Sequence, residues 1–184
     1  MSIATVVFEA PPGGIDANII ADLRTDHAGE TGAVWIYRGV LTFARNKALI
    51  EFARHHLETE QSHLDLINEI LPRNERSVLT PMWRVAGWIT GAAPALFGPR
   101  AVYATIEAVE TFVDRHYEEQ IQKLIGRADY RSLLEVLRRC QADEVAHRDE
   151  AREKQDRPAG PLLSLWTKIV AFGSESAVSL ARRI

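Results

Sequence analysis

Apolar residues recur at alternating intervals of three and four along four long stretches of the chain, residues 17–46, 47–71, 101–125 and 130–155. This spacing places the apolar side chains of each stretch on one face of an α-helix, as in the helices of a bundle. Asp16 is predicted to cap the first helix, and Pro72 and Gly126 are predicted to end the second and third. The pattern predicts an all-α fold built on four bundle helices.

Six titratable residues interrupt the apolar pattern at positions where a bundle helix normally carries an apolar side chain. They form two similar sets, in which a Glu precedes a Glu-x-x-His pair by 30 residues in the first set and by 34 in the second. A Glu and a His three residues apart lie on one face of a helix. One Glu from each of two helices, with one Glu-x-x-His pair from each of two others, is the ligand set of ferritin-like bundles that bind two iron or manganese ions. The candidate metal ligands are Glu30, Glu60, His63, Glu110, Glu144 and His147.

Charge also favours a metal site. Four carboxylates facing one core would repel one another and would be costly to bury alone, whereas two divalent cations would neutralise them. Mixed carboxylate and imidazole ligands suit iron or manganese. One Glu-x-x-His pair arises readily by chance in a chain with 16 Glu and 6 His. Two pairs, each preceded at a similar distance by a Glu in an apolar pattern, are much harder to obtain by chance.

Two aspartates are candidates to orient the ligand histidines. A metal-ligating histidine usually donates its second ring N–H to a carboxylate. Asp26 and Asp143 lie close to candidate ligands along the chain, and the sequence does not decide which would pair with His63 and which with His147. For Asp26, a solvent-facing helix acid is the alternative interpretation.

Three further residues on the bundle helices have two interpretations each. His116 and Tyr117 lie about two turns after Glu110 and are candidates for substrate binding or proton transfer, with simple packing as the alternative. Cys140, the single cysteine, is interpreted as a small core residue rather than a reactive thiol. His27 is interpreted as a packed residue rather than a seventh ligand.

Three segments lie outside the four bundle helices. Residues 1–14 are predicted to be an extended lead-in. The uncharged segment 85–99 would be about 22 Å long as a helix, too short to cross a hydrocarbon layer of about 30 Å. It is interpreted as an apolar crossover that contacts the membrane interface, with a core crossover between the two halves as the alternative. Residues 162–184 are predicted to form an amphipathic helix that caps the bundle or adds to a membrane surface.

Composition indicates the number of domains, the class of partner and the cellular compartment. A length of 184 residues fits one domain, here 15–184, and a net charge of −3 gives no indication of nucleic-acid binding. A single cysteine forms no internal disulfide, which favours a reducing compartment. The N-terminus lacks the basic and apolar regions of a secretory signal.

Five sequence blocks resemble the demethoxyubiquinone hydroxylases of ubiquinone biosynthesis, in the same order over nearly all of the chain after residue 15. They are DHAGETGAVWIYRG (26–39), ETEQSH (58–63), PMWRVAGWITG (81–91), AVETFVDRHY (108–117) and ADEVAHRDE (142–150). The resemblance implies that the six candidate ligands bind two iron ions, with Glu60 and Glu144 bridging, and that His116 and Tyr117 lie near the quinone. Thr31 and Arg148 depart from the residues that many relatives carry, which leaves pocket shape and redox tuning open.

The resemblance implies an O2-using di-iron monooxygenase that hydroxylates the ring of a membrane-dissolved polyprenyl quinol. An external electron donor would re-reduce the iron, because no nicotinamide or flavin motif is visible. The expected location is the cytoplasmic face of the inner cell membrane, as a peripheral protein, with a homo-oligomer or a complex of quinone enzymes left open. The alternatives are a ferroxidase or other iron-handling protein, and a membrane scaffold with a structural metal.

Overall fold

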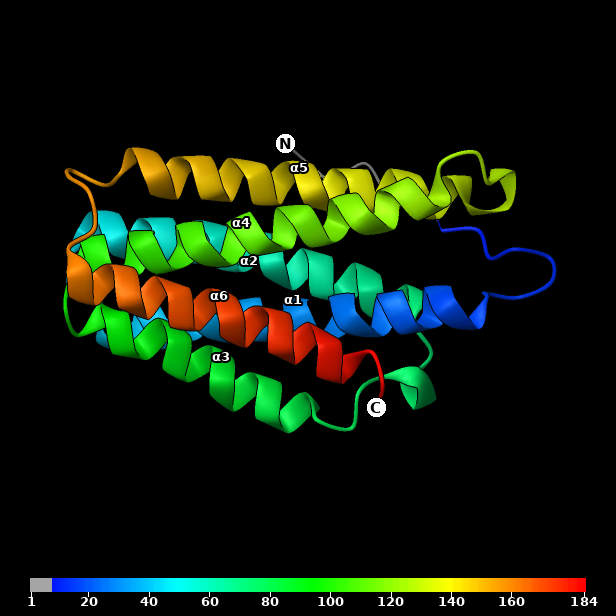
Figure 1. The fold of residues 1–184 in the computed structure, drawn as a ribbon, viewed down its shortest axis with the longest axis horizontal. Coiled ribbons are helices and arrows are strands. Elements are labelled where there is room, and N and C mark those ends of the chain that lie inside the picture. Colours follow the sequence, from blue (N-terminus) through cyan, green and yellow to red (C-terminus); the bar gives the residue numbers. More distant parts are fainter. Residues whose placement is uncertain (1–7) are drawn as a thin grey trace.

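The computed structural model describes residues 8–184. In this range the chain forms six α-helices and two short 3-10 helices, with no β-strand. The elements are α1 (Ala17–Phe43), α2 (Lys47–Ile70), η1 (Arg73–Glu75), α3 (Thr80–Ala95), α4 (Pro99–Leu124), η2 (Ala128–Tyr130), α5 (Arg131–Glu153) and α6 (Pro161–Ala181). Figure 1 shows α1, α2, α4 and α5 running along the long axis of the molecule, with α3 and α6 on one side. The predicted all-α, ferritin-like fold is confirmed.

The helix ends follow the predicted boundaries, with one correction. Asn46 caps α2, because its side chain accepts a hydrogen bond from the Leu49 N–H at 3.0 Å. Asp16 occupies the predicted N-cap position of α1, and its carbonyl accepts the first helical hydrogen bond from Ile20, but its side chain makes no cap hydrogen bond, which corrects the capping role expected of that side chain. Its carboxylate instead pairs with Arg127 at 2.8 Å, which ties the start of α1 to the α4–α5 connection. Of the predicted lead-in, residues 8–14 contain a turn and no helix, and residues 1–7 lie outside the described part of the chain.

The core consists of two apolar clusters, one toward each end of the bundle. One contains Leu23 of α1, Ile67 of α2, Ile121 of α4 and Cys140 of α5, so the interpretation of this cysteine as a core residue is confirmed. The other contains residues further along α1, from Ile36 to Val40, and the opposite ends of the other three helices. The candidate metal ligands of each helix lie between the parts of that helix that enter the two clusters. The bundle therefore encloses its charged residues between two layers of apolar packing.

Helix α3 is an additional element outside the four bundle helices, and of the segment 85–99 only Ala95 enters a core cluster. Residues 85–95 belong to α3, which continues through Pro94 and packs mainly along α1, and a turn then leads to α4. Gly91 permits the close approach, since a Cβ on it would overlap the Ile36 carbonyl of α1. The opposite face of α3 is exposed and apolar at Val85 and Ile89, and Phe97 in the turn after the helix is exposed as well. The segment thus combines packing on the bundle with an unpaired apolar surface.

Helix α6 lies against α4 and α1 on the same side of the molecule as α3 (Figure 1). Only Val170 and Ala181 of this helix are buried, while Leu162, Leu165 and Phe172 are exposed. The predicted amphipathic C-terminal helix is therefore present as an outer layer over the bundle. Among the described residues, no helix has the length and continuous apolar character needed to cross a membrane.

Candidate metal centre

The six residues predicted as ligands come together in the middle of the bundle. Glu30 comes from α1, Glu60 and His63 from α2, Glu110 from α4, and Glu144 and His147 from α5. All six are buried, none being more than 4% exposed. Their donor atoms form two groups in which the atoms lie within 4.8 Å of one another, Glu30–Glu60–His63–Glu144 and Glu60–Glu110–Glu144–His147. Glu60 and Glu144 belong to both groups, so each would supply ligands to both of two ions held here.

Several buried atoms in this centre lack the hydrogen bonds that a metal-free core would need. Among the described residues, no hydrogen bond satisfies either carboxylate oxygen of Glu60 or Glu144, or Nδ1 of His63 or His147. His63 Nδ1 lies 3.0 Å from Glu144, and His147 Nδ1 lies 3.0 Å from Glu60. Those distances suit hydrogen bonds but the directions do not. Buried polar atoms are nearly always satisfied in folded proteins, so the donor set fits a pair of metal ions.

The titration of the metal-free centre points the same way. Burial, with the nearby Glu60 and Glu144 carboxylates, raises the pKa of Glu30 well above its usual range, and the pKa of Glu110 is raised in the same manner. Burial would lower the pKa of His147, but its interactions with Glu144 and Glu60 raise that pKa to about 10. Protons therefore balance the buried charge when metal is absent, and cations would take their place.

Two tyrosines hold the carboxylates that the two groups do not share. Tyr117 of α4 donates a hydrogen bond to Glu30 of α1, and Tyr37 of α1 donates one to Glu110 of α4 at 3.4 Å. Each tyrosine lies seven residues after the Glu of its own helix and reaches the Glu of the other helix. In the sequence, Tyr37 stands at one of the apolar positions of its helix. The repeated Glu-x6-Tyr spacing was the signal that could have identified it.

The two aspartates predicted to orient histidines have separate positions. Asp143 Oδ2 lies 3.1 Å from His63 Nε2, and this contact lowers the pKa of Asp143. Asp26 instead accepts a hydrogen bond from Gln120 at 2.5 Å and lies 3.4 Å from His116. His27, also on α1, is packed in the interior, where burial lowers its pKa to about 4, and it belongs to neither metal group.

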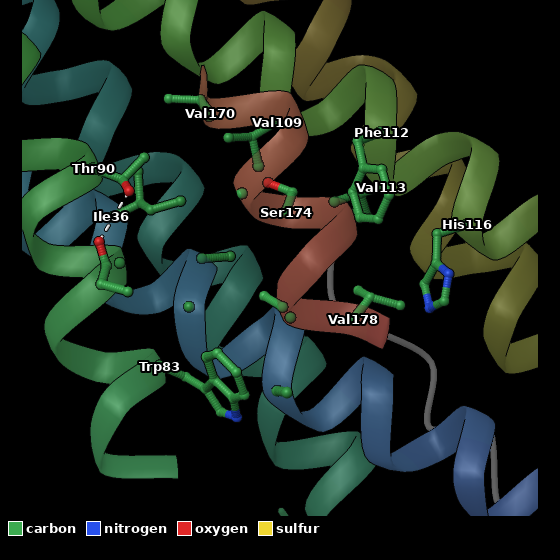
Figure 2. Close-up of a pocket in the computed structure, with 18 of the residues that line it drawn as sticks. Ile36, Trp83, Thr90, Val109, Phe112, Val113, His116, Val170, Ser174 and Val178 are labelled. Atoms are coloured by element: carbon green, nitrogen blue, oxygen red, sulfur yellow. Dashed lines mark hydrogen bonds between the residues drawn. The ribbon is translucent and has the colours of Figure 1, made fainter. Parts of the chain in front are cut away.

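One cavity of about 490 Å³ reaches the metal centre. Glu30, Glu60, Glu110 and Glu144 line it together with mostly apolar residues of α1, α3, α4 and α6. Figure 2 shows Phe112 and His116 of α4, Ser174 and Val178 of α6, and Trp83 of α3 around this space. The cavity therefore connects an apolar space to the cluster of candidate metal ligands.

A polar group lies beside the ligands at the inner part of the cavity. Thr25 donates its hydroxyl proton to the Asp22 carbonyl at 2.6 Å, and its hydroxyl oxygen lies 2.9 Å from His116 Nε2. Gln120 lies 2.9 Å from the same nitrogen. Asp26 Oδ2 is buried and, among the described residues, has no hydrogen-bond partner. Thr25, Asp26, His116 and Tyr117 all line the cavity, which gives it hydrogen-bonding atoms close to the metal ligands. Sequence analysis did not identify Thr25 or Gln120, which carry no spacing signal.

The model of the family described as "Ubiquinone biosynthesis protein COQ7" matches residues 17–181, a range that contains all six candidate ligands.

Curated relatives span bacteria and eukaryotes. The chain is 34% identical over 168 residues to the 3-demethoxyubiquinol 3-hydroxylase of Rhodospirillum rubrum, covering 88% of this chain and 76% of the relative. It is 32% identical over 165 residues, with the same coverage, to the mitochondrial NADPH-dependent 3-demethoxyubiquinone 3-hydroxylase of Rattus norvegicus. It is 31% identical over 156 residues to the mitochondrial 5-demethoxyubiquinone hydroxylase of Saccharomyces cerevisiae, covering 76% of this chain and 67% of the relative.

Proposed function

The chain belongs to the COQ7 family of ubiquinone biosynthesis proteins, and we propose that it hydroxylates the ring of a polyprenyl demethoxybenzoquinol, a demethoxyubiquinol, with O2. The observation that carries this proposal is the cavity of about 490 Å³, which joins an apolar passage to the carboxylates of a two-metal centre. Its size and apolar lining suit an organic ligand rather than a hydrated ion. In the reaction, one oxygen atom enters the ring, the other leaves as water, and an external donor supplies two electrons.

Iron is the metal proposed for the centre. Carboxylate and imidazole donors suit it, and two shared carboxylates match the inward ligand set of di-iron bundles. When bound, the iron pair would supply the activation of O2 that ring hydroxylation requires. The protein would fix the ligands: Tyr117 and Tyr37 hold the unshared carboxylates Glu30 and Glu110, and Asp143 holds the ring of His63.

The polar group at the inner part of the cavity would orient the quinol ring. Asp26 Oδ2 is a buried acceptor without a hydrogen-bond partner in the part of the chain that the structure describes, and it would accept a hydrogen bond from a ring hydroxyl. His116 is 11% exposed and lies 3.4 Å from the other oxygen of Asp26. This arrangement would let the Asp26–His116 pair pass a proton between the ring hydroxyl and solvent. The apolar walls would exclude water from the remainder of the site.

A membrane supplies the substrate in this proposal. The exposed apolar residues of α3 and α6 lie on the two helices that also line the cavity. A polyprenyl quinol stays in the bilayer because of its apolar tail, so these helices would rest in the interface at the cytoplasmic face of the membrane, with the chain as a peripheral protein. The ring would then enter between them while the end of the tail remains in lipid.

Mass spectrometry of the product tests the proposal. Protein loaded anaerobically with ferrous iron is mixed with a demethoxyubiquinol and ¹⁸O2, with a chemical reductant as the electron donor. The proposal predicts a product that carries one ¹⁸O atom on the ring, and no such product from metal-free protein. Oxidation of ferrous iron by O2 without any hydroxylated quinol would contradict the proposal and would favour a ferroxidase. No turnover of either kind would favour a structural metal.

A further inference from the structure

Glycines in the helices of this protein fall into two classes. A Cβ added to Gly39, Gly87 or Gly91 would lie closer than 3.0 Å to the backbone of a neighbouring helix, so these glycines allow α1 and α3 to pack together. A Cβ added to Gly29, Gly32 or Gly173 would meet nothing within 4 Å. A side chain at the second class would therefore not collide with a neighbouring helix, although the Gly32 backbone itself lies against Gly87 of α3.

The backbone does not require the second class either. In the described residues, the glycines with positive φ are Gly14, Gly98 and Gly126, all outside helix interiors. Gly29, Gly32 and Gly173 have ordinary helical backbone and lie well inside α1 and α6. Glycine destabilises a helix interior relative to alanine, because it gains no side-chain contacts and loses more backbone freedom. Three such positions need another explanation, and all three line the cavity.

Their positions define a path through that cavity. Gly29 is exposed although Ala28 and Glu30 beside it are buried, because it faces the open space. One face of α1 lines the cavity over about three turns, because its lining residues follow at intervals of three and four. They are Thr25, Gly29, Gly32 and Ile36. Gly173 lines the same cavity from α6. Asp26 and Glu30 of α1 line the same cavity, and each has a buried carboxylate oxygen without a hydrogen-bond partner among residues 8–184, which independently marks a place for a polar ligand.

We propose that Gly29, Gly32 and Gly173 set the width of a passage for the first isoprene units of the substrate tail. This inference rests on the proposed function, in which the quinol ring lies beside the metal ligands and Asp26. The tail must then extend from the ring along the cavity-lining faces of α1 and α6. An isoprenoid chain carries a methyl branch in every unit, and side chains at these glycines would take up the space that the branches need.

Leucine and alanine substitutions test the passage. Gly32→Leu and Gly173→Leu fill the space from two helices, whereas Gly32→Ala adds one carbon where a Cβ meets no atom. Ser179→Leu is the matched control, because Ser179 is an exposed residue of α6 that does not line this cavity. Three quinones that share one ring are compared: one with a full polyprenyl tail, one with a single isoprene unit, and one with a methyl group in place of the tail.

Two measurements are made on every variant. Binding of each oxidised quinone to metal-free protein is followed by quenching of tryptophan fluorescence, because Trp83 and Trp166 line the cavity. Turnover of each quinol by iron-loaded protein gives kcat/KM. Each leucine variant is expected to bind both tailed quinones about a hundredfold more weakly, the loss that follows when roughly four carbons stay unburied. The tail-free quinone should bind within about threefold of wild type, and Ser179→Leu should behave as wild type.

The Gly32→Ala variant distinguishes a glycine that provides space for the tail from a glycine that the fold requires. If the glycine only provides space, the alanine variant has a melting temperature equal to or above that of wild type and still binds tailed quinones more weakly. A lower melting temperature with unchanged binding would show a structural glycine and overturn the inference.

The remaining outcomes also decide the question. Wild-type binding of tailed quinones by both leucine variants would show that the tail leaves elsewhere, and an equal loss for tail-free quinone would show that the ring occupies this space. Either result overturns the inference even if wild-type protein hydroxylates the quinol. If wild type binds tailed quinones but hydroxylates none, the proposed function fails, and the fluorescence comparison still decides whether the glycines form a tail passage.

Discussion

Replacement of Asp143 by asparagine tests how the centre holds one of its histidines. Asp143 Oδ2 lies 3.1 Å from His63 Nε2, so Asp143→Asn keeps the shape of the contact and removes its charge. Loss of a carboxylate behind a metal-ligating histidine weakens metal affinity by roughly 10–100-fold, or about 1.4–2.7 kcal/mol. The Asp143 side chain is 44% exposed, and solvent screens an exposed pair. We therefore expect a loss near the lower limit, about tenfold.

Competition between protein and a chelator for ferrous iron, without oxygen, measures this loss. Asp26→Asn is the matched control, because it makes the same change near the centre but beside His116 and Gln120. It should bind iron within about twofold of wild type and should turn over quinol more slowly. Wild-type iron affinity in Asp143→Asn, or an equal loss in the two variants, would refute the role assigned to Asp143.

Three further predictions follow from the same structure. Metal binding should strengthen as pH rises toward 10, because the pKa of His147 is about 10 without metal and its proton must leave before the ring can bind an ion. Calorimetry in buffers of different ionisation enthalpy should detect protons released on metal binding, and proton uptake would contradict this prediction. Gly91→Ala should lower the melting temperature by about 5 °C, because the Cβ of the alanine would overlap the Ile36 carbonyl. An unchanged melting temperature would show that α1 and α3 can separate slightly at no cost. Phe172→Glu should reduce liposome binding with iron content intact. Ile125 is an exposed apolar residue in the α4–α5 connection, and Ile125→Glu should not reduce this binding. Equal losses of liposome binding in the two variants would place the membrane contact elsewhere.

The helices and the set of candidate ligands could be predicted because both follow from periodicity. A helix places residues three and four apart on one face, so a Glu or His in an apolar pattern must face the interior wherever the apolar residues do. Cys140 could be assigned to the core for the same reason, and it is 1% exposed. Periodicity fixes a direction from one helix and therefore identifies which residues meet in the middle of a bundle.

Contacts between helices could not be predicted in this way. Asp26 and Asp143 each lie near candidate ligands in sequence, and only the packing of α5 beside α2 places Asp143 next to His63. Periodicity gave Tyr37 an apolar role, although its hydroxyl reaches Glu110 on another helix. The composition of 85–99 indicated an apolar segment but not that glycines would seat one of its faces on α1, because a glycine needed for close packing and a glycine that leaves open space look the same in sequence.

Anaerobic titration of metal-free protein with ferrous iron tests the central claim most directly, because the claim is that six side chains from four helices hold a pair of ions. The account predicts that binding ends at two irons per chain, and that Glu60→Ala, which removes an oxygen donor from both groups, prevents this occupancy. A wild-type end point of one iron per chain, or no binding, would contradict the account.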